Sequence, residues 1–212
     1  CPEVEHGVDR WPCDPAVERP NYRGFAYLVG ELAAQGYVAL SININAENTF
    51  GFGEPVPGER LRQLVDLHLG ALAEASAGGA NDFGIDLAGR ADLNRLVIAG
   101  HSRGGDAAIA LARDLATEAE RGEVAFGPVD GLLLIAPAPN FADPAGGAPA
   151  PMATVLPACD ADVVDQVGQV FYEATRLETT HDWATSVWLE RANHNNFNST
   201  LPGDPFGLNG RP

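Results

Sequence analysis

The sequence predicts an α/β fold in which a mostly parallel sheet is covered by helices on both faces. Two observations lead to this prediction. Short, almost wholly apolar segments alternate with segments whose apolar residues recur at helical spacing. One apolar segment also passes through a glycine-rich turn directly into a helical pattern. The chain has 212 residues, of which 45% are hydrophobic. This is enough for one sizeable core, so we predict a single domain over residues 1–212.

The amino-terminal half predicts a loop, two helices and one strand. Residues 1–20 contain four prolines among charged residues and predict an irregular loop. Residues 22–35 carry apolar side chains at helical spacing, and Gly36 follows as a cap. Residues 37–44 predict a strand. Residues 59–77 predict a second amphipathic helix, which ends at a pair of glycines.

The carboxyl-terminal half predicts four strands and two helices in alternation. The strands are expected at residues 96–99, 131–136, 152–156 and 185–190, and the helices at residues 105–120 and 163–176. Residues 137–151 are rich in Pro, Ala and Gly and predict a loop. Ligands of such sheets lie beyond the carboxyl ends of the strands, so we expect the functional residues there.

The turn at Gly100-His101-Ser102-Arg103-Gly104 follows the pattern G-x-S-x-G. This pattern is short and also arises in ordinary turns. Between a strand and a helix, however, it is typical of a nucleophile elbow, in which the serine hydroxyl stands clear of the sheet. We expect Gly100 and Gly104 to be required because a Cβ at either position would collide with neighbouring backbone. Ser102 is therefore the predicted nucleophile, at a helix N-terminus that favours developing negative charge.

A serine nucleophile needs a base and an orienting carboxylate, which follow it along the chain in the order acid, then histidine. Two aspartates, Asp160 and Asp162, follow the predicted strand at residues 152–156. The position just before an apolar pair favours Asp162 as the acid, and Asp160 is expected to cap a turn. His194 is the histidine just past the last predicted strand, and it is the predicted base. His68 is expected to pack on its helix, and His101 is expected to be structural or solvated.

The chain resembles the α/β-hydrolase superfamily, and within it secreted bacterial serine hydrolases of the cutinase, polyester-hydrolase and platelet-activating-factor acetylhydrolase-like groups. The resemblance covers roughly residues 11–200. It rests on the following segments: Trp11-Pro12-Cys13, Arg23-Gly24-Phe25, Gly36-Tyr37-Val38, residues 92–105, Cys159-Asp160-Ala161-Asp162-Val163 and Asn193-His194-Asn195. Plant chlorophyllases are similar at Gly100-His101-Ser102-Arg103-Gly104-Gly105 as well, so the elbow by itself does not name a substrate.

The resemblance implies a serine hydrolase that cleaves carboxylic esters without a cofactor or metal. It implies that Ser102 attacks, His194 transfers the proton, Asp162 orients the imidazole and the Arg103 backbone N–H binds the oxyanion. A second oxyanion donor ordinarily follows a strand that we do not find before residue 22. The resemblance therefore implies that this chain starts after the first strands of its domain. The same triad acting on amide or other acyl bonds, and a binding module without catalysis, remain alternatives.

Composition limits the partners. The formal net charge is −16, and all 13 basic residues are arginine. Such a surface repels nucleic acid and anionic membranes, so a neutral or cationic small molecule, or a polymeric ester, is the expected substrate. The sequence contains no apolar run long enough to span a membrane.

The three cysteines bear on the compartment. Cys1 and Cys13 lie close together in the irregular first segment, which suggests a disulfide and therefore a secreted or periplasmic protein. Two free thiols in a cytosolic protein are the alternative. Cys159 is then left over, either as a buried thiol or as a partner for a cysteine outside this chain.

Overall fold

The computed structural model describes residues 16, 18–45, 58–123, 125–178 and 182–201. Its residues fall into two compact units. One comprises Cys1–Ala91 with Phe197–Pro202, and the other comprises Asp92–Asn196 with Gly203–Pro212. The prediction of one domain remains a prediction.

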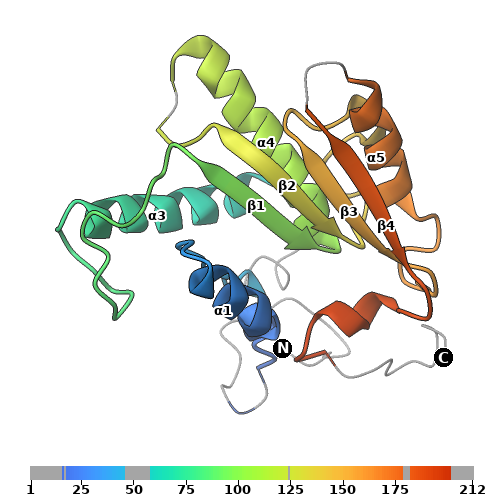
Figure 1. The fold of residues 1–212 in the computed structure, drawn as a ribbon, viewed down its shortest axis with the longest axis horizontal. Helices are drawn as coiled ribbons and strands as arrows, with labels where there is room; N and C mark the ends of the chain where they lie inside the picture. Colours follow the sequence, from blue (N-terminus) through green and yellow to red (C-terminus); the bar gives the residue numbers. More distant parts are fainter. Residues whose placement is uncertain (1–15, 17, 46–57, 124, 179–181, 202–212) are drawn as a thin grey trace. The chain divides into compact units, whose positions relative to one another are not determined.

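The first unit contains the helices expected from the amino-terminal half (Figure 1). A 3-10 turn, η1 (Asn21–Phe25), leads into α1 (Ala26–Ala34), and α3 spans Glu59–Ser76. Gly36 has a φ of 92° and Gly78 a φ of 82°. Both are left-handed conformations that glycine adopts without strain just past a helix end. The two helix predictions are therefore confirmed.

The strand predicted at residues 37–44 is not present, because none of these residues belongs to a strand in the structure. Tyr37 is 58% exposed and Val38 is 39% exposed. The prediction rested on a run of apolar residues, but a strand exists only where a neighbouring strand supplies its hydrogen bonds. The prediction of a strand at residues 37–44 is therefore wrong.

A late segment of the chain is anchored to η1 and α1. The Tyr27 hydroxyl donates to the Phe197 carbonyl at 2.9 Å, and Asn198 Nδ2 donates to the Asn21 carbonyl at 3.0 Å. A Cβ at Gly24 would lie 1.7 Å from Asn198 Oδ1. The side chain of Asn198 therefore occupies space that only glycine leaves open. This contact belongs to the Arg23-Gly24-Phe25 segment that carries part of the resemblance.

The second unit is built on a parallel sheet of four strands in the order β1-β2-β3-β4, which confirms the α/β class (Figure 1). The strands are β1 (Leu96–His101), β2 (Val129–Ile135), β3 (Met152–Pro157) and β4 (Ala184–Leu189). Helix α4 (Arg103–Arg121) follows β1, and α5 (Val167–Leu177) precedes β4. All six predicted elements are present. α5 starts four residues later than expected, because residues 163–166 still belong to the turn that follows β3.

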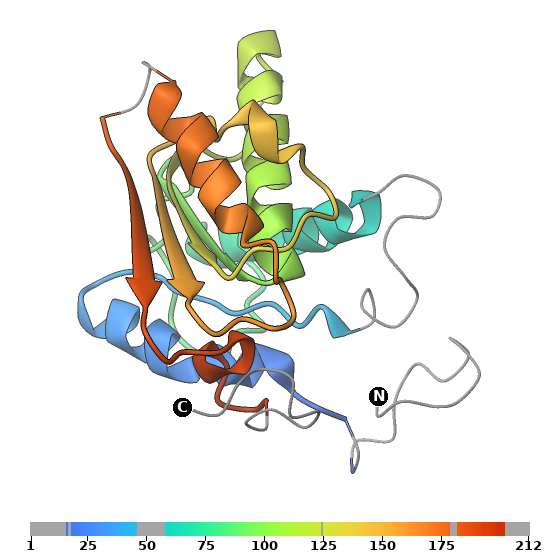
Figure 2. The ribbon, with the colours of Figure 1, turned by 90° about the vertical axis from the view of Figure 1, so that its right-hand side faces the viewer.

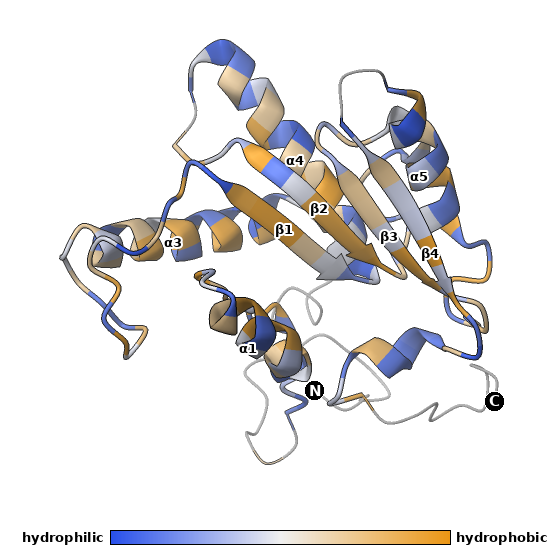
Figure 3. Ribbon diagram, viewed as in Figure 1, coloured by the Kyte–Doolittle hydropathy of each residue, from blue (hydrophilic) through white to orange (hydrophobic). Residues whose placement is uncertain are grey.

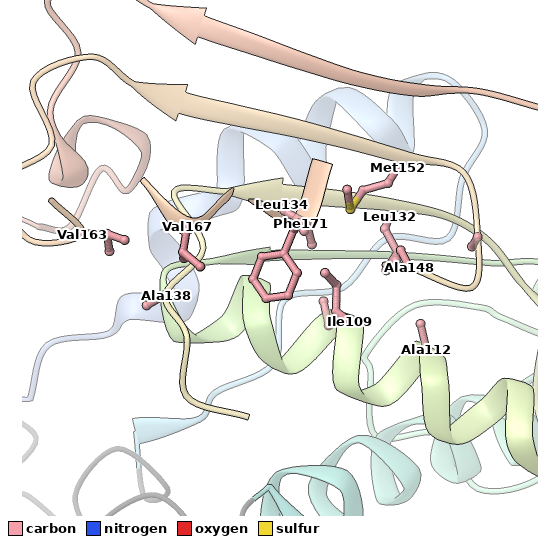
Figure 4. Packing of buried hydrophobic residues seen from close by; sticks show 12 residues of the cluster. Ile109, Ala112, Leu132, Leu134, Ala138, Ala148, Met152, Val163, Val167 and Phe171 are labelled. Carbon is pink, nitrogen blue, oxygen red and sulfur yellow. The ribbon is translucent and has the colours of Figure 1, made fainter. Parts of the chain in front are cut away.

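Both helices of this unit pack on one face of the sheet (Figure 2). Right-handed crossovers in a sheet that grows in one direction place successive helices on the same side. The close-up in Figure 4 shows Phe171 of α5 directed toward Ile109 of α4, and both side chains are fully buried. Leu132, Leu134 and Met152 of the sheet complete this core. The expectation of helices on both faces stays a prediction, since α1 and α3 belong to the other unit.

The outer strand β4 is the least apolar and the most exposed of the four. Figure 3 shows more polar colouring on β4 than on β1. Trp188 is 49% exposed and Val187 is 44% exposed, whereas Met152 and Leu156 of β3 are buried. Among the described residues, no helix is both long enough and apolar enough to cross a membrane.

Candidate active site

Ser102 lies at the turn between β1 and α4, as the elbow prediction requires. It is the N-cap residue of α4 and has φ 56° and ψ −125°, a conformation that non-glycine residues rarely adopt. Its N–H donates to the Ile135 carbonyl at 2.9 Å, and its carbonyl accepts from the Ala138 N–H at 3.1 Å. These bonds to the end of β2 and the residues after it hold the serine in the strained conformation.

The two motif glycines behave differently. A Cβ at Gly100 would lie 2.0 Å from the Gly104 carbonyl oxygen, so this position requires glycine. A Cβ at Gly104 would meet nothing within 4 Å. The expectation that Gly104 prevents a collision is therefore wrong, because its Cβ position faces open space. The second tight position is Gly105, where a Cβ would lie 3.0 Å from both the Gly100 carbonyl oxygen and Pro137 Cβ.

Arg103 is the first residue of α4. Helix geometry offers no intrahelical acceptor to an N–H at this position, which is why such groups serve as anion donors. Burial lowers the pKa of the Arg103 guanidinium, and the nearby charge of Asp162 opposes that shift. The Arg103 side chain thus lies on the same side of the site as Asp162.

His194 lies in the short 3-10 turn η3 (His194–Phe197), and its side chain is buried. Its Nδ1 lies 2.9 Å from Asp160 Oδ2, and the Asp160 side chain is only 1% exposed. Asp160 Oδ1 accepts from the N–H groups of Asp162 at 2.9 Å and Val163 at 2.8 Å. Burial raises the pKa of Asp160, but the hydrogen bonds from His194 and Val163 outweigh it, and the pKa is lowered overall. Asp160 is therefore an ionised carboxylate that holds the proton on Nδ1.

Asp162 occupies a different place. Its side chain is 65% exposed, and its Oδ2 lies 3.3 Å from His194 Nε2, the other ring nitrogen. A carboxylate that orients a catalytic imidazole contacts Nδ1 and leaves Nε2 to the serine. The geometry therefore ranks the two aspartates in the opposite order to the sequence analysis. The difference comes from the turn in which Asp160 Oδ1 binds the Asp162 and Val163 N–H groups. This turn directs the Asp160 carboxylate inward and leaves the Asp162 side chain exposed.

His101 links the elbow to the loop of His194. Its Nε2 lies 2.8 Å from the His194 carbonyl oxygen, and the two rings have centroids 4.6 Å apart. Burial lowers the pKa of His101 to about 4, and repulsion from His194 adds to the shift. The ring is therefore neutral near pH 7, with Nε2–H donating to the carbonyl. The residue next to Ser102 thus holds His194 close to the elbow, which fits the structural role expected for His101.

Asp106 is a residue that the sequence analysis missed. It lies in the first turn of α4, is fully buried and accepts hydrogen bonds from the N–H groups of Asn140, Phe141 and Ala142, the last at 2.9 Å. Burial raises its pKa, and these three bonds act in the opposite direction. Asp106 therefore fixes the start of the loop that follows β2. An acidic residue among the alanines of an amphipathic helix was the available signal.

The structure thus brings His194, Asp160, Asp162 and the elbow residues to the carboxyl ends of β1 and β3 in one unit. Among the described residues, Ser102 Oγ makes no hydrogen bond. Cys159 is a free and exposed thiol. Cys1 and Cys13 lie outside the described residues, so the disulfide between them stays a prediction. The second oxyanion donor, expected from strands before this chain, also stays a prediction. His68 Nδ1 lies 2.7 Å from the Leu64 carbonyl oxygen on α3, in keeping with a structural role.

The described part of the chain holds no cluster of three or more His, Cys, Asp or Glu side chains that could hold a metal ion. Asp160 and Asp162 flank one imidazole instead, and Asp160 has both oxygens engaged by N–H donors. Such an arrangement suits proton transfer by the imidazole.

No protein-family model and no curated protein matches the chain. Among solved structures, the chain is similar to a protein named "Putative hydrolase" from Agrobacterium vitis S4, with 18% sequence identity and a TM-score of 0.38. The match covers 48% of this chain and 55% of that chain, so it spans about half the length of that protein. A likeness at this level does not establish a family.

Proposed function

We propose that this protein is an α/β-hydrolase-type serine hydrolase that cleaves carboxylic esters. The observation that carries the proposal is the buried His194–Asp160 pair, which His101 connects to the strained strand-to-helix turn that carries Ser102. A buried imidazole with one nitrogen bound to an ionised carboxylate is the arrangement that makes histidine a base for a neighbouring hydroxyl. A turn that only connects a strand to a helix has no need of that pair.

In the proposed reaction, Ser102 Oγ attacks the ester carbonyl while His194 Nε2 takes its proton. The imidazolium that forms is stabilised by Asp160, which also keeps the proton of the neutral ring on Nδ1. His194 then returns its proton to the leaving alcohol, and water releases the acid by the reverse sequence. Asp160 replaces Asp162 in the orienting role, because Asp160 contacts Nδ1 and is shielded from solvent.

The oxyanion is proposed to accept a hydrogen bond from the Arg103 N–H at the start of α4. This donor lies next to the nucleophile in the chain, so the strained turn that presents Ser102 also presents the N–H. The reaction as proposed needs no cofactor and no metal. A secreted or periplasmic location is part of the same proposal, and it depends on the predicted bond between Cys1 and Cys13.

The proposal is tested by labelling with a fluorophosphonate probe, which reacts with activated serines, and by turnover of p-nitrophenyl esters. We expect labelling of the wild-type chain and none of Ser102→Ala. Labelling that persists in Ser102→Ala would show that another residue reacts. No labelling of a folded wild-type chain would favour the alternative of a binding module. Turnover of a peptide or anilide panel, with no turnover of esters, would favour the same triad acting on amide bonds.

A further inference from the structure

The carboxylate of Asp162 lies beside the ring nitrogen that protonates the leaving group in the proposed reaction. Its Oδ2 is 3.3 Å from His194 Nε2, the nitrogen that delivers the proton to the departing alcohol in the proposed reaction. An alcohol that receives this proton would therefore lie near the Asp162 carboxylate. The carboxylate is 65% exposed, so it can also move to meet such a group.

The neutral imidazole cannot satisfy this carboxylate. Because Asp160 accepts the hydrogen bond from Nδ1–H, the neutral ring presents a lone pair at Nε2. A lone pair and a carboxylate oxygen at 3.3 Å repel each other unless a donor or a cation lies between or beside them. Asp162 is therefore poised to interact with a positive charge that arrives with the substrate.

The charged groups around the His194 ring also leave an excess of negative charge. Asp160 and Asp162 contact the two ring nitrogens, and His101 is neutral. The charge of Asp162 raises the pKa of Arg103, but burial of Arg103 lowers it more and so disfavours the charged guanidinium. Two carboxylates against one guanidinium leave an excess of negative charge at the site. The net charge of −16 on the whole chain adds long-range attraction for cations.

We propose that Asp162 is a specificity-determining residue that favours esters whose alcohol carries a cationic group, such as esters of amino alcohols. This inference rests on the proposed ester hydrolysis and names the substrate class of the same site. Asp162 acts on the leaving group through charge and takes no part in the proton transfer itself. Its effect should therefore fall on the choice between substrates.

The test compares butyrylcholine with 3,3-dimethylbutyl butyrate, which has the same shape with a carbon atom in place of the ammonium nitrogen. The measured quantity is the ratio of kcat/KM for the charged ester to that for the uncharged ester. We expect Asp162→Asn to lower this ratio about two- to fivefold, the size of an exposed ion-pair interaction. Asp162→Lys should lower it further, and the difference between wild type and variant should shrink at high salt.

Asp165→Asn is the matched control, since it removes the same charge from an exposed side chain three residues away. It should change the ratio by much less than Asp162→Asn. Equal changes in the two variants, or no change in either, would overturn the proposal. Hydrolysis of neither ester by a folded wild-type chain that also fails to label would contradict the proposed function instead. The two failures are thus distinguishable.

Discussion

The candidate active site has an inner side and an outer side, and residues two to four positions apart in the chain lie on opposite sides. On the inner side, Asp160 is buried and bound by two backbone N–H groups, and Gly100 is packed against the backbone of the next turn. On the outer side, Asp162 is 65% exposed and Gly104 faces open space. The two sides share residue types and differ in what surrounds them.

This difference shows that backbone hydrogen bonding sets the direction and burial of each carboxylate within a short loop. Asp160 and Asp162 follow the same strand and have the same side chain. Only Asp160 is held so that one oxygen receives two N–H groups and the other faces an imidazole. A buried carboxylate that accepts three hydrogen bonds stays ionised and rigid, which an orienting group requires. We therefore expect substitutions on the inner side to have large effects and those on the outer side to have small ones.

The largest expected effect comes from removing Ser102 or His194, the proposed nucleophile and its base. Ser102→Ala and His194→Ala should each lower kcat by about 10⁴- to 10⁶-fold, because the nucleophile and its base act as a unit. Steady-state hydrolysis of p-nitrophenyl butyrate measures this, with circular dichroism as the check on folding. The double variant should be little worse than either single one. Multiplicative losses would show that the two residues act independently.

The next effect distinguishes the two aspartates directly. Asp160→Asn should lower kcat by about 10³- to 10⁴-fold, because an amide in this position stabilises neither the imidazolium nor the required tautomer. Asp162→Asn should change kcat for a neutral ester by less than about tenfold, since its contact is exposed. Parallel kcat measurements on both variants provide the comparison. A crippled Asp162→Asn beside an active Asp160→Asn would restore the order expected from the sequence.

Gly100 on the inner side and Gly104 on the outer side allow the two sides to be compared by protein stability. Gly100→Ala should lower the free energy of unfolding by about 3 kcal/mol or more, because the new Cβ would overlap backbone atoms that cannot move away. Gly104→Ala should leave stability unchanged or raise it by up to about 1 kcal/mol, since it adds a helix-favouring residue in open space. Urea denaturation at pH 7 measures both. Similar losses in the two variants would mean that the elbow has another geometry.

Much of the second unit could be predicted from the sequence. Its strands are buried on the face that packs on α4 and α5, so apolar runs mark them, and glycine-rich turns mark where they end. Ser102 and His194 were predicted in the same way, because Ser102 directly follows β1 and His194 lies in the turn after β4. The segment 37–44 has the same apolar character but no strand partner, and hydropathy does not report whether a partner exists.

The features that escaped prediction depend on contacts between distant segments or on side-chain direction. The contact between Asp160 and His194 depends on a turn in which the Asp160 side chain binds two backbone N–H groups. Sequence position alone does not show which way that side chain points. Asp106 accepts hydrogen bonds from backbone N–H groups that begin at Asn140, 34 residues later, so nothing local in the sequence indicates its partners. Gly105 has little room for a Cβ because Pro137, which is likewise distant in the chain, packs against it.

The last prediction concerns His101, which joins the inner side of the site to the loop of His194. Burial lowers its pKa from 6.5 to about 4, so the folded state disfavours the protonated ring. The stability contributed by the neutral ring is fully present above pH 6.5 and is lost as the pH falls toward 4. For a shift of this size, linkage gives a loss of about 2 kcal/mol between pH 7.5 and pH 5.

His101→Gln removes this titration and keeps an N–H donor for the His194 carbonyl. The destabilisation caused by the substitution should therefore be about 2 kcal/mol smaller at pH 5 than at pH 7.5. Urea denaturation of both proteins at the two pH values measures the difference. His68→Gln is the control, because it replaces a histidine outside the site. An equal pH dependence of wild type and His101→Gln would mean that the ring of His101 takes up its proton as readily in the folded protein as in the unfolded chain.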